Sequence, residues 1–234
     1  MIRRLFTIFV MFLSQISLSV SFDRVVDKEE YLFFKNLHHH VYSWKTLIDQ
    51  KNYEDILFLG DKPEYGSHSI GKILRDSRLN FEAHFWSSDL LYRDRDFAAF
   101  PFFHQRKINH QERFSFEDKS FDVVMGRRIL CHCESRMAMS TCGGIDVENA
   151  EMLSRFLSET VRVLNHKRDS FVFLHGLEPK DSRRKDVISE CYQQAFEQIK
   201  QDQEDLFIFM LRSPFKKHRR FGLYIGRSDF REWN

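Results

Sequence analysis

Short apolar runs alternate with amphipathic segments along most of the chain. Residues 55–59 form such a run, and Gly60 and Asp61 follow it at once. An apolar run that stops in a turn is typical of a parallel strand buried on both faces. Further strands are predicted at 81–86, 102–108, 121–125, 170–174, 206–211 and 221–225, and helices at 28–50, 67–77, 147–165 and 186–201.

The order of these elements predicts the fold class. Strands that alternate with helices favour a mostly parallel sheet with both faces covered. The last two strands are joined by a turn too short for a crossover helix, so they must pair antiparallel. We therefore predict an α/β fold: a single doubly wound, mostly parallel sheet of the seven-stranded type, with helices on both faces and a C-terminal antiparallel hairpin.

The N-terminus has a different composition. Arg3 and Arg4 precede an apolar stretch at 5–13, and the stretch 17–21 supplies small residues. This pattern resembles a secretory signal cleaved near Ser21, which predicts an exported protein, periplasmic or secreted. The apolar stretch is shorter than a membrane span. An uncleaved anchor at 5–20 and a buried helix are the alternatives. The predicted divisions are a signal peptide at 1–21, a helical extension at 22–52 and a domain at 53–234.

Composition and charge limit the classes of binding partner that we expect. The 234 residues suit one domain, and the 25 Phe imply bulky interiors. The net charge of +2 does not call for nucleic acid. The basic cluster at 216–220 has no aromatic platform beside it, so we expect a solvated hairpin tip. The three histidines at 38–40 cannot share one helix face, and we expect a surface position for them.

The cysteines leave three possibilities open. Cys131, His132, Cys133 and Cys142 lie within twelve residues and could supply sulfur and nitrogen ligands to zinc. The Cys-x-Cys spacing is tighter than in common zinc sites, which makes zinc the weaker alternative. A disulfide from Cys142 to Cys131 or Cys133 would suit an exported protein, and free thiols are the third possibility.

Two strings give the chain a family resemblance. The strings F-S-F-E-D-K-S-F-D-V-V at 114–124 and E-T-V-R-V-L at 159–164, together with the order of elements, resemble the class I S-adenosylmethionine-dependent methyltransferases. The resemblance covers roughly 53–227. It implies a methyltransferase-like Rossmann fold, S-adenosylmethionine as cofactor, and a small molecule or protein as methyl acceptor.

The resemblance also implies where a cofactor would lie. The loop after the first strand would pass under the methionine part, an acid ending the second strand would accept hydrogen bonds from the ribose hydroxyls, and the residues before the 114–124 string would contact adenine. The implied residues are Gly60, Asp61, Gly66, Asp89, Asn109 and His110. Trp86 or Ser87 stands at the directly aligned acid position, so Asp89 could serve only if the turn shifts.

No catalytic residue follows from the resemblance. Methyl transfer from a sulfonium depends mainly on in-line positioning and exclusion of water, so it needs little acid or base chemistry. The first glycine loop is longer than the family's usual spacing, and the predicted export separates the chain from a cofactor made in the cytoplasm. The alternative function is therefore a catalytically degenerate fold that serves as an exported binding or interaction protein.

Overall fold

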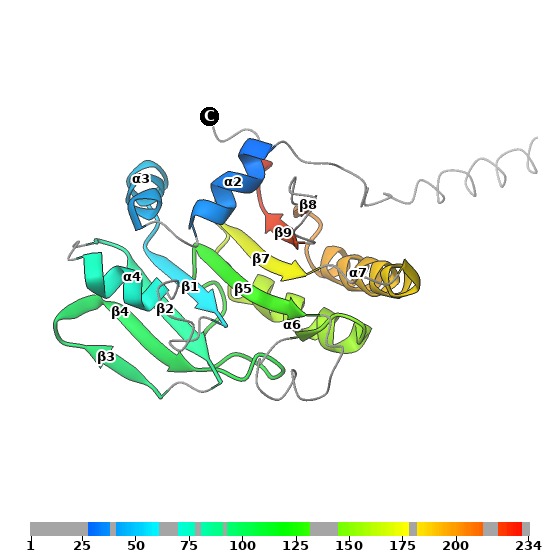
Figure 1. Ribbon diagram of the computed structural model, residues 1–234, viewed down its shortest axis with the longest axis horizontal. Coiled ribbons are helices and arrows are strands. Elements are labelled where there is room, and N and C mark those ends of the chain that lie inside the picture. Colours follow the sequence, from blue (N-terminus) through cyan, green and yellow to red (C-terminus); the bar gives the residue numbers. More distant parts are fainter. Residues whose placement is uncertain are drawn as a thin grey trace, which may run out of the picture.

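One mixed sheet runs through the molecule, with helices packed on both of its faces (Figure 1). The computed structural model describes residues 28–37, 41–60, 70–77, 81–90, 93–131, 145–177, 182–212 and 220–230. The strands in these ranges are β1 (Asp55–Leu59), β2 (His84–Asp89), β3 (Arg95–Phe97), β4 (Phe100–Lys107), β5 (Val123–Cys131), β6 (Ile145–Asp146), β7 (Phe171–Leu177), β8 (Phe207–Arg212) and β9 (Arg220–Gly226). The helices are α2 (Lys28–Leu37), α3 (Val41–Lys51), α4 (Ile70–Ser77), α6 (Ala150–Arg162) and α7 (Ser182–Asp202).

The strand order confirms the predicted fold class. It reads β3-β4-β2-β1-β5-β7-β9-β8, with β6 beside β5. The strands β4, β2, β1, β5 and β7 run parallel. The strand β9 lies between β7 and β8 and is antiparallel to both, which is the predicted terminal hairpin.

Each face of the sheet has its own apolar core. On one face Phe34 of α2 stacks on Phe173 of β7 at 4.5 Å between ring centroids, and Trp44 of α3 meets Phe58 of β1 at 5.4 Å. On the other face α6 and α7 pack together over β5 and β7. The helices of the predicted 22–52 extension therefore complete the core of the domain, because Phe34 and Trp44 are fully buried against the strands.

Several element boundaries differ from the prediction. The expected helix at 28–50 is two helices, and the histidines at 38–40 between them lie outside the described residues. The prediction ended the fourth long strand at Met125, whereas β5 continues to Cys131. Arg127 and Arg128 interrupt its apolar pattern, and the pairing with β7 shifts in register between Arg127 and Leu130. The short strands β3 and β6 were not predicted.

Side chains tie the strands together at their amino ends. Asp122 precedes β5, and its Oδ2 accepts a hydrogen bond from the backbone N of Glu54 at 2.6 Å. The Lys167 ammonium lies 3.0 Å from Asp122 Oδ1. Tyr53, just before β1, donates to the backbone oxygen of Asp169, just before β7, at 2.6 Å. The amino ends of β1, β5 and β7 are thus cross-connected by buried or half-buried polar groups.

The two strings that carry the family resemblance contact each other. Glu159 Oε2 accepts from the backbone N of Phe114 at 2.9 Å. Arg162 donates to the backbone oxygens of Phe114 at 3.1 Å and Phe116 at 3.0 Å, and it pairs with Glu159 at 2.8 Å and Asp118 at 2.5 Å. We call this group of Glu159, Arg162 and residues 114–118 the Arg162 clamp. It fastens the segment between β4 and β5 to α6.

The N-terminal predictions fall largely outside the structure. Residues 1–27, with the signal, its cleavage near Ser21 and the alternative anchor at 5–20, are not among the described residues, and these features stay predictions. Within the ranges that are described, no helix has the length and apolar character to cross a membrane.

Candidate functional site

The carboxyl ends of β1, β2 and β4 lie side by side, because these strands are parallel neighbours. This edge of an open α/β sheet is where such folds hold their ligands. Gly60 follows β1 with φ of +70°, a left-handed conformation that favours glycine. Its backbone N donates to the backbone oxygen of Ser88 at 2.9 Å. The chain therefore leaves β1 directly beside the end of β2.

Asp89 is the last residue of β2. It lies opposite Lys107 of β4, only 1% of it is exposed, and its backbone oxygen accepts from Ile108 at 3.3 Å. The strand carries Asp89 to the carboxyl edge of the sheet. Trp86 lies three residues earlier, where its indole N donates to Asp55 Oδ1 at 2.8 Å.

His110 is the buried member of the predicted adenine pair. Its Nε2 lies 3.5 Å from Ser88 Oγ, and its ring meets Phe114 and Phe156 edge-on at 6.2 and 6.5 Å. Asn109 uses both of its polar side-chain atoms locally: Nδ2 donates to Glu112 at 2.7 Å, and Oδ1 accepts from the backbone N of Gln111 at 3.2 Å. His110 therefore faces the sheet edge, while Asn109 shapes the turn.

Ser88 connects these groups and was missed by sequence reasoning. Its backbone oxygen accepts from Gly60, its hydroxyl donates to the backbone oxygen of Phe58 at 3.0 Å, and the same hydroxyl lies near His110. Two adjacent small polar residues at the end of a strand were the available signal. The structure thus joins Gly60, Asp89 and His110 around one strand end.

The remaining predicted site residues cannot be placed in this way. Asp61, Gly66, His132, Cys133 and Cys142 lie outside the described residues, and of Cys131 only the backbone, at the end of β5, is described. In the ranges that are described, no group of three or more His, Cys, Asp or Glu side chains is placed to hold a metal ion. Cys191 is buried, and its thiol lies 3.5 Å from the backbone oxygen of Glu148.

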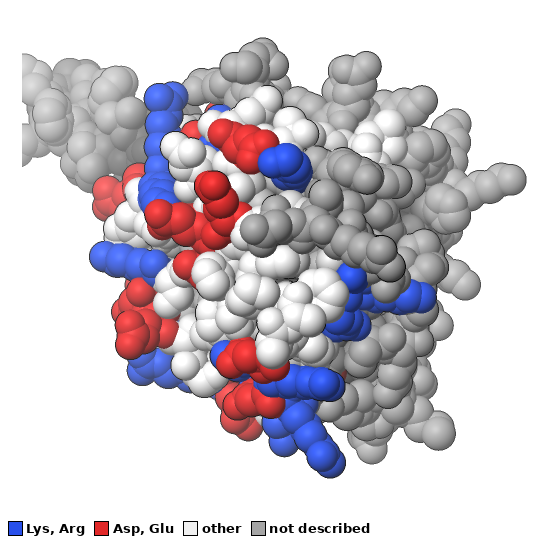
Figure 2. Space-filling model, turned by 90° about the vertical axis from the view of Figure 1, so that its left-hand side faces the viewer, with Lys and Arg blue, Asp and Glu red and all other residues white. Residues whose placement is uncertain are grey.

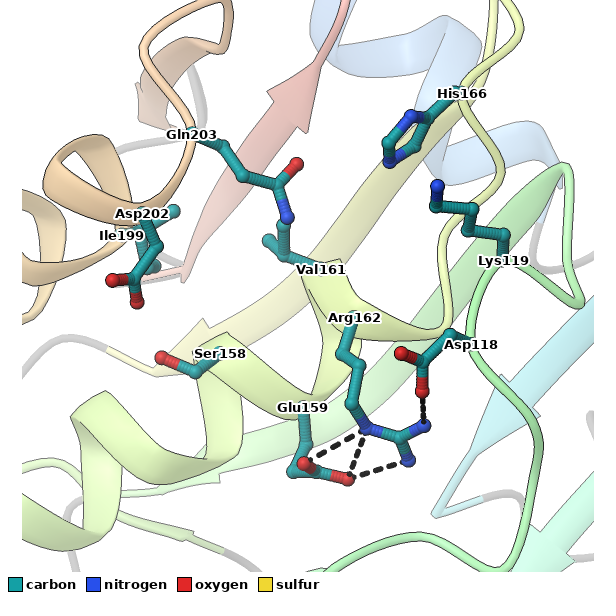
Figure 3. A pocket seen from close by; sticks show the side chains of 10 residues that line it. All are labelled: Asp118, Lys119, Ser158, Glu159, Val161, Arg162, His166, Ile199, Asp202 and Gln203. Carbon is teal, nitrogen blue, oxygen red and sulfur yellow. Dashed lines mark hydrogen bonds and ion pairs between the residues drawn. The ribbon is translucent and has the colours of Figure 1, made fainter.

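A pocket of about 440 Å³ opens at the opposite edge of the sheet (Figure 3). Its lining comes from the segment before β5, the C-terminal turn of α6, the segment before β7 and the end of α7. These residues are Asp118, Lys119, Ser158, Glu159, Val161, Arg162, His166, Ile199, Asp202 and Gln203. A six-residue strand such as β2 spans about 20 Å, so the pocket is separate from the carboxyl edge that holds Gly60 and Asp89.

The side of the molecule formed by α3, α4 and the edge strands β3 and β4 carries mixed charge. Figure 2 shows Lys and Arg side chains interspersed with Asp and Glu over its described part. Asp96 on β3 accepts hydrogen bonds from Arg106 at 2.9 Å and His104 at 2.7 Å, and these bonds hold the pKa of Asp96 below its usual value. His104 Nε2 in turn lies 2.8 Å from His84 Nδ1. Such pairs give this side no field of a single sign.

Comparison with known proteins gives structural matches alone. No family model matches the chain, and no curated protein matches its sequence. A SAM-dependent methyltransferase from Leishmania major matches with a TM-score of 0.47 and 10% identity, covering 82% of this chain and 70% of its own. An O-methyltransferase from Bacillus cereus in complex with SAH matches at 0.42 and 10%, covering 90% and 86%. Aeropyrum pernix fibrillarin with bound S-adenosyl-L-methionine matches at 0.40 and 10%, covering 74% and 66%.

Proposed function

We propose that the chain binds S-adenosylmethionine at the carboxyl edge of β1, β2 and β4 and is a methyltransferase with a small molecule or a protein as acceptor. One observation carries the proposal. Gly60, in a left-handed conformation, is bonded to the end of β2, and the buried carboxylate of Asp89 lies at that same strand end. A backbone turn that favours glycine thus adjoins a buried acid where this fold class binds nucleotides.

The residues at this edge suit the parts of the cofactor. A carboxylate offers several acceptor sites for two neighbouring hydroxyls, and hydrogen bonds to an ionised acceptor are the stronger kind. Asp89 would hold the ribose in this way. The imidazole of His110 can donate or accept one hydrogen bond, and the rings of Phe114 and Phe156 make its surroundings apolar.

Methyl transfer requires little acid or base chemistry from the side chains. When bound, the cofactor supplies an electrophilic methyl group on sulfur. The protein's part is to orient the acceptor and to keep water away from the reacting atoms, and orientation alone accounts for much of such a rate enhancement. We therefore assign binding roles to Gly60, Asp89 and His110 and no catalytic residue.

Calorimetric titration of the full chain with S-adenosylhomocysteine tests the proposal. We expect saturable binding, weakened about 10- to 100-fold by Asp89→Asn, because a hydrogen bond to a charged group contributes about 1.5–3 kcal/mol. Asp49→Asn is the matched control. Asp49 is an exposed acid on α3 that pairs with Lys45, so its loss should leave the affinity unchanged.

Two results would overturn the proposal. One is the absence of any heat at millimolar ligand with a chain whose circular dichroism shows it to be folded. The other is an equal affinity of the Asp89→Asn and Asp49→Asn variants, which would place the ligand away from β2.

A further inference from the structure

The pocket at the amino edge of the sheet has a lining that the proposed methyltransferase does not use. It lies beyond the amino ends of β5 and β7, whereas Gly60 and Asp89 lie beyond the carboxyl ends of β1 and β2. A hollow of about 440 Å³ is within the size range of small-ligand sites. What it can bind follows from the charges and donors that face into it.

Lys119 enters the pocket from a strained backbone position. Its φ is +61°, a left-handed conformation that is unfavourable for a residue with a long side chain. The backbone N of Lys119 donates to the backbone oxygen of Arg162 at 3.0 Å, which holds it there. Strain of this kind costs about 1 kcal/mol or more, and it clusters at functional sites. Glycine would fit this turn better, so the lysine side chain needs a reason beyond the fold.

The pocket's positive charge is concentrated on one side. Arg162 is neutralised by Glu159 and Asp118 in the Arg162 clamp. Lys119 has no acid within ion-pair distance in the described part of the chain. Figure 3 shows its ammonium and the ring of His166 close together on one side of the hollow.

The surroundings of His166 disfavour its charged form. Loss of hydration lowers the pKa of His166, and Arg227 and Lys119 lower it further, while Asp205 acts in the opposite direction. An oxyanion between Lys119 and His166 would offset the repulsion between the two side chains.

The rest of the lining supplies a donor in the middle and acceptors at the far side. Gln203 Oε1 accepts from Arg227 at 2.6 Å, which leaves its amide NH₂ directed into the pocket (Figure 3). Asp202 and Ser158 lie opposite Lys119, and the apolar side chains of Val161 and Ile199 complete the lining.

We propose that this pocket binds a small organic oxyanion, a phosphate monoester or a carboxylate, that also carries an ammonium group. The oxyanion contacts Lys119, His166 and the Gln203 amide, and the ammonium contacts Asp202. The site does not depend on S-adenosylmethionine, so its test and the test of the methyltransferase proposal are independent.

The probes are O-phosphoethanolamine, β-alanine and inorganic phosphate, added to the full chain while the His166 ring resonances are followed by NMR across pH. His166→Gln identifies those resonances. We expect saturable binding of at least one of the two zwitterions, accompanied by a rise in the pKa of His166, because a nearby anion favours the charged imidazole. A larger effect from O-phosphoethanolamine identifies a phosphate ligand, and a larger effect from β-alanine identifies a carboxylate.

Variants separate binding from stability. Lys119→Gly should fold at least as stably as the natural chain, since glycine adopts φ of +61° readily, yet bind at least about tenfold more weakly. Asn52→Gly relieves a similar φ of +53° outside the pocket and should leave binding unchanged. Asp202→Asn should weaken the zwitterion and not inorganic phosphate.

The proposal is overturned if neither zwitterion changes the His166 titration at about 10 mM, a concentration that reveals even millimolar affinity. It is equally overturned if Lys119→Gly binds as tightly as the natural chain.

Discussion

The Arg162 clamp leads to a specific prediction about the free energy of unfolding. Replacing Arg162 by Met keeps most of the apolar stem and removes the guanidinium. Three partners then lose a donor: the Glu159 carboxylate and the backbone oxygens of Phe114 and Phe116. We therefore expect the free energy of unfolding to fall substantially.

The magnitude follows from burial. The side chains of Arg162 and Glu159 are only 16% and 14% exposed, so breaking their pair leaves a half-buried charge. Asp118 is 61% exposed, and its pair with Arg162 is screened by water. Counting the carboxylate and the two carbonyls and neglecting Asp118, Arg162→Met should cost about 2–4 kcal/mol.

Urea unfolding followed by circular dichroism measures this cost, with the slope checked for constancy. The same helix offers a matched control in Arg155, whose pair with Glu151 spans 2.7 Å between side chains 57% and 84% exposed. Arg155→Met should cost less than about 0.5 kcal/mol. If Arg162→Met and Arg155→Met lower the urea midpoint equally, the Arg162 clamp stabilises the fold no more than an exposed ion pair does, and the reasoning is wrong.

Two further predictions concern pH and packing. Burial raises the pKa of Tyr53 and of Tyr224, so both phenols stay protonated in the folded chain, and the stability that this provides below about pH 10 should be lost as the pH rises further. Phenolate absorbance and urea midpoints measured across pH check this prediction. Normal titration of all seven tyrosines in the folded chain would contradict it. Gly222→Ala would place its Cβ against the ring of Phe173 and should cost about 1–3 kcal/mol; Phe173→Leu in the same chain should recover part of that cost, whereas strictly additive losses in thermal unfolding would refute the contact.

The sequence predicts the fold well where burial controls the pattern. The apolar runs of β1, β7 and β9 face buried surroundings on both sides, so hydrophobicity alone marks them. The continuation of β5 through Arg127 and Arg128 could not be found in this way, because it depends on backbone pairing with β7 at Arg127 and again at Leu130. The strands β3 and β6 are too short to show a period.

The candidate site is predictable only in part. Gly60 and Asp89 could be found because residue type and position at a strand end suffice. The bridging role of Ser88 depends on the register of β1 against β2, which spacing along the chain does not reveal. The contact of Arg162 with Asp118 joins residues 44 positions apart, and the left-handed turn at Lys119 depends on it being anchored to α6.

The ties at the amino edge have a consequence for how relatives of this chain can diverge. Asp122, Tyr53 and Lys167 fix the starting points of β1, β5 and β7 relative to one another. The strand register is thereby set at one end, and segments leaving the other end do not have to maintain it. Insertions and deletions should therefore accumulate after the strands, while the lengths of the segments that enter β5 and β7 stay constant.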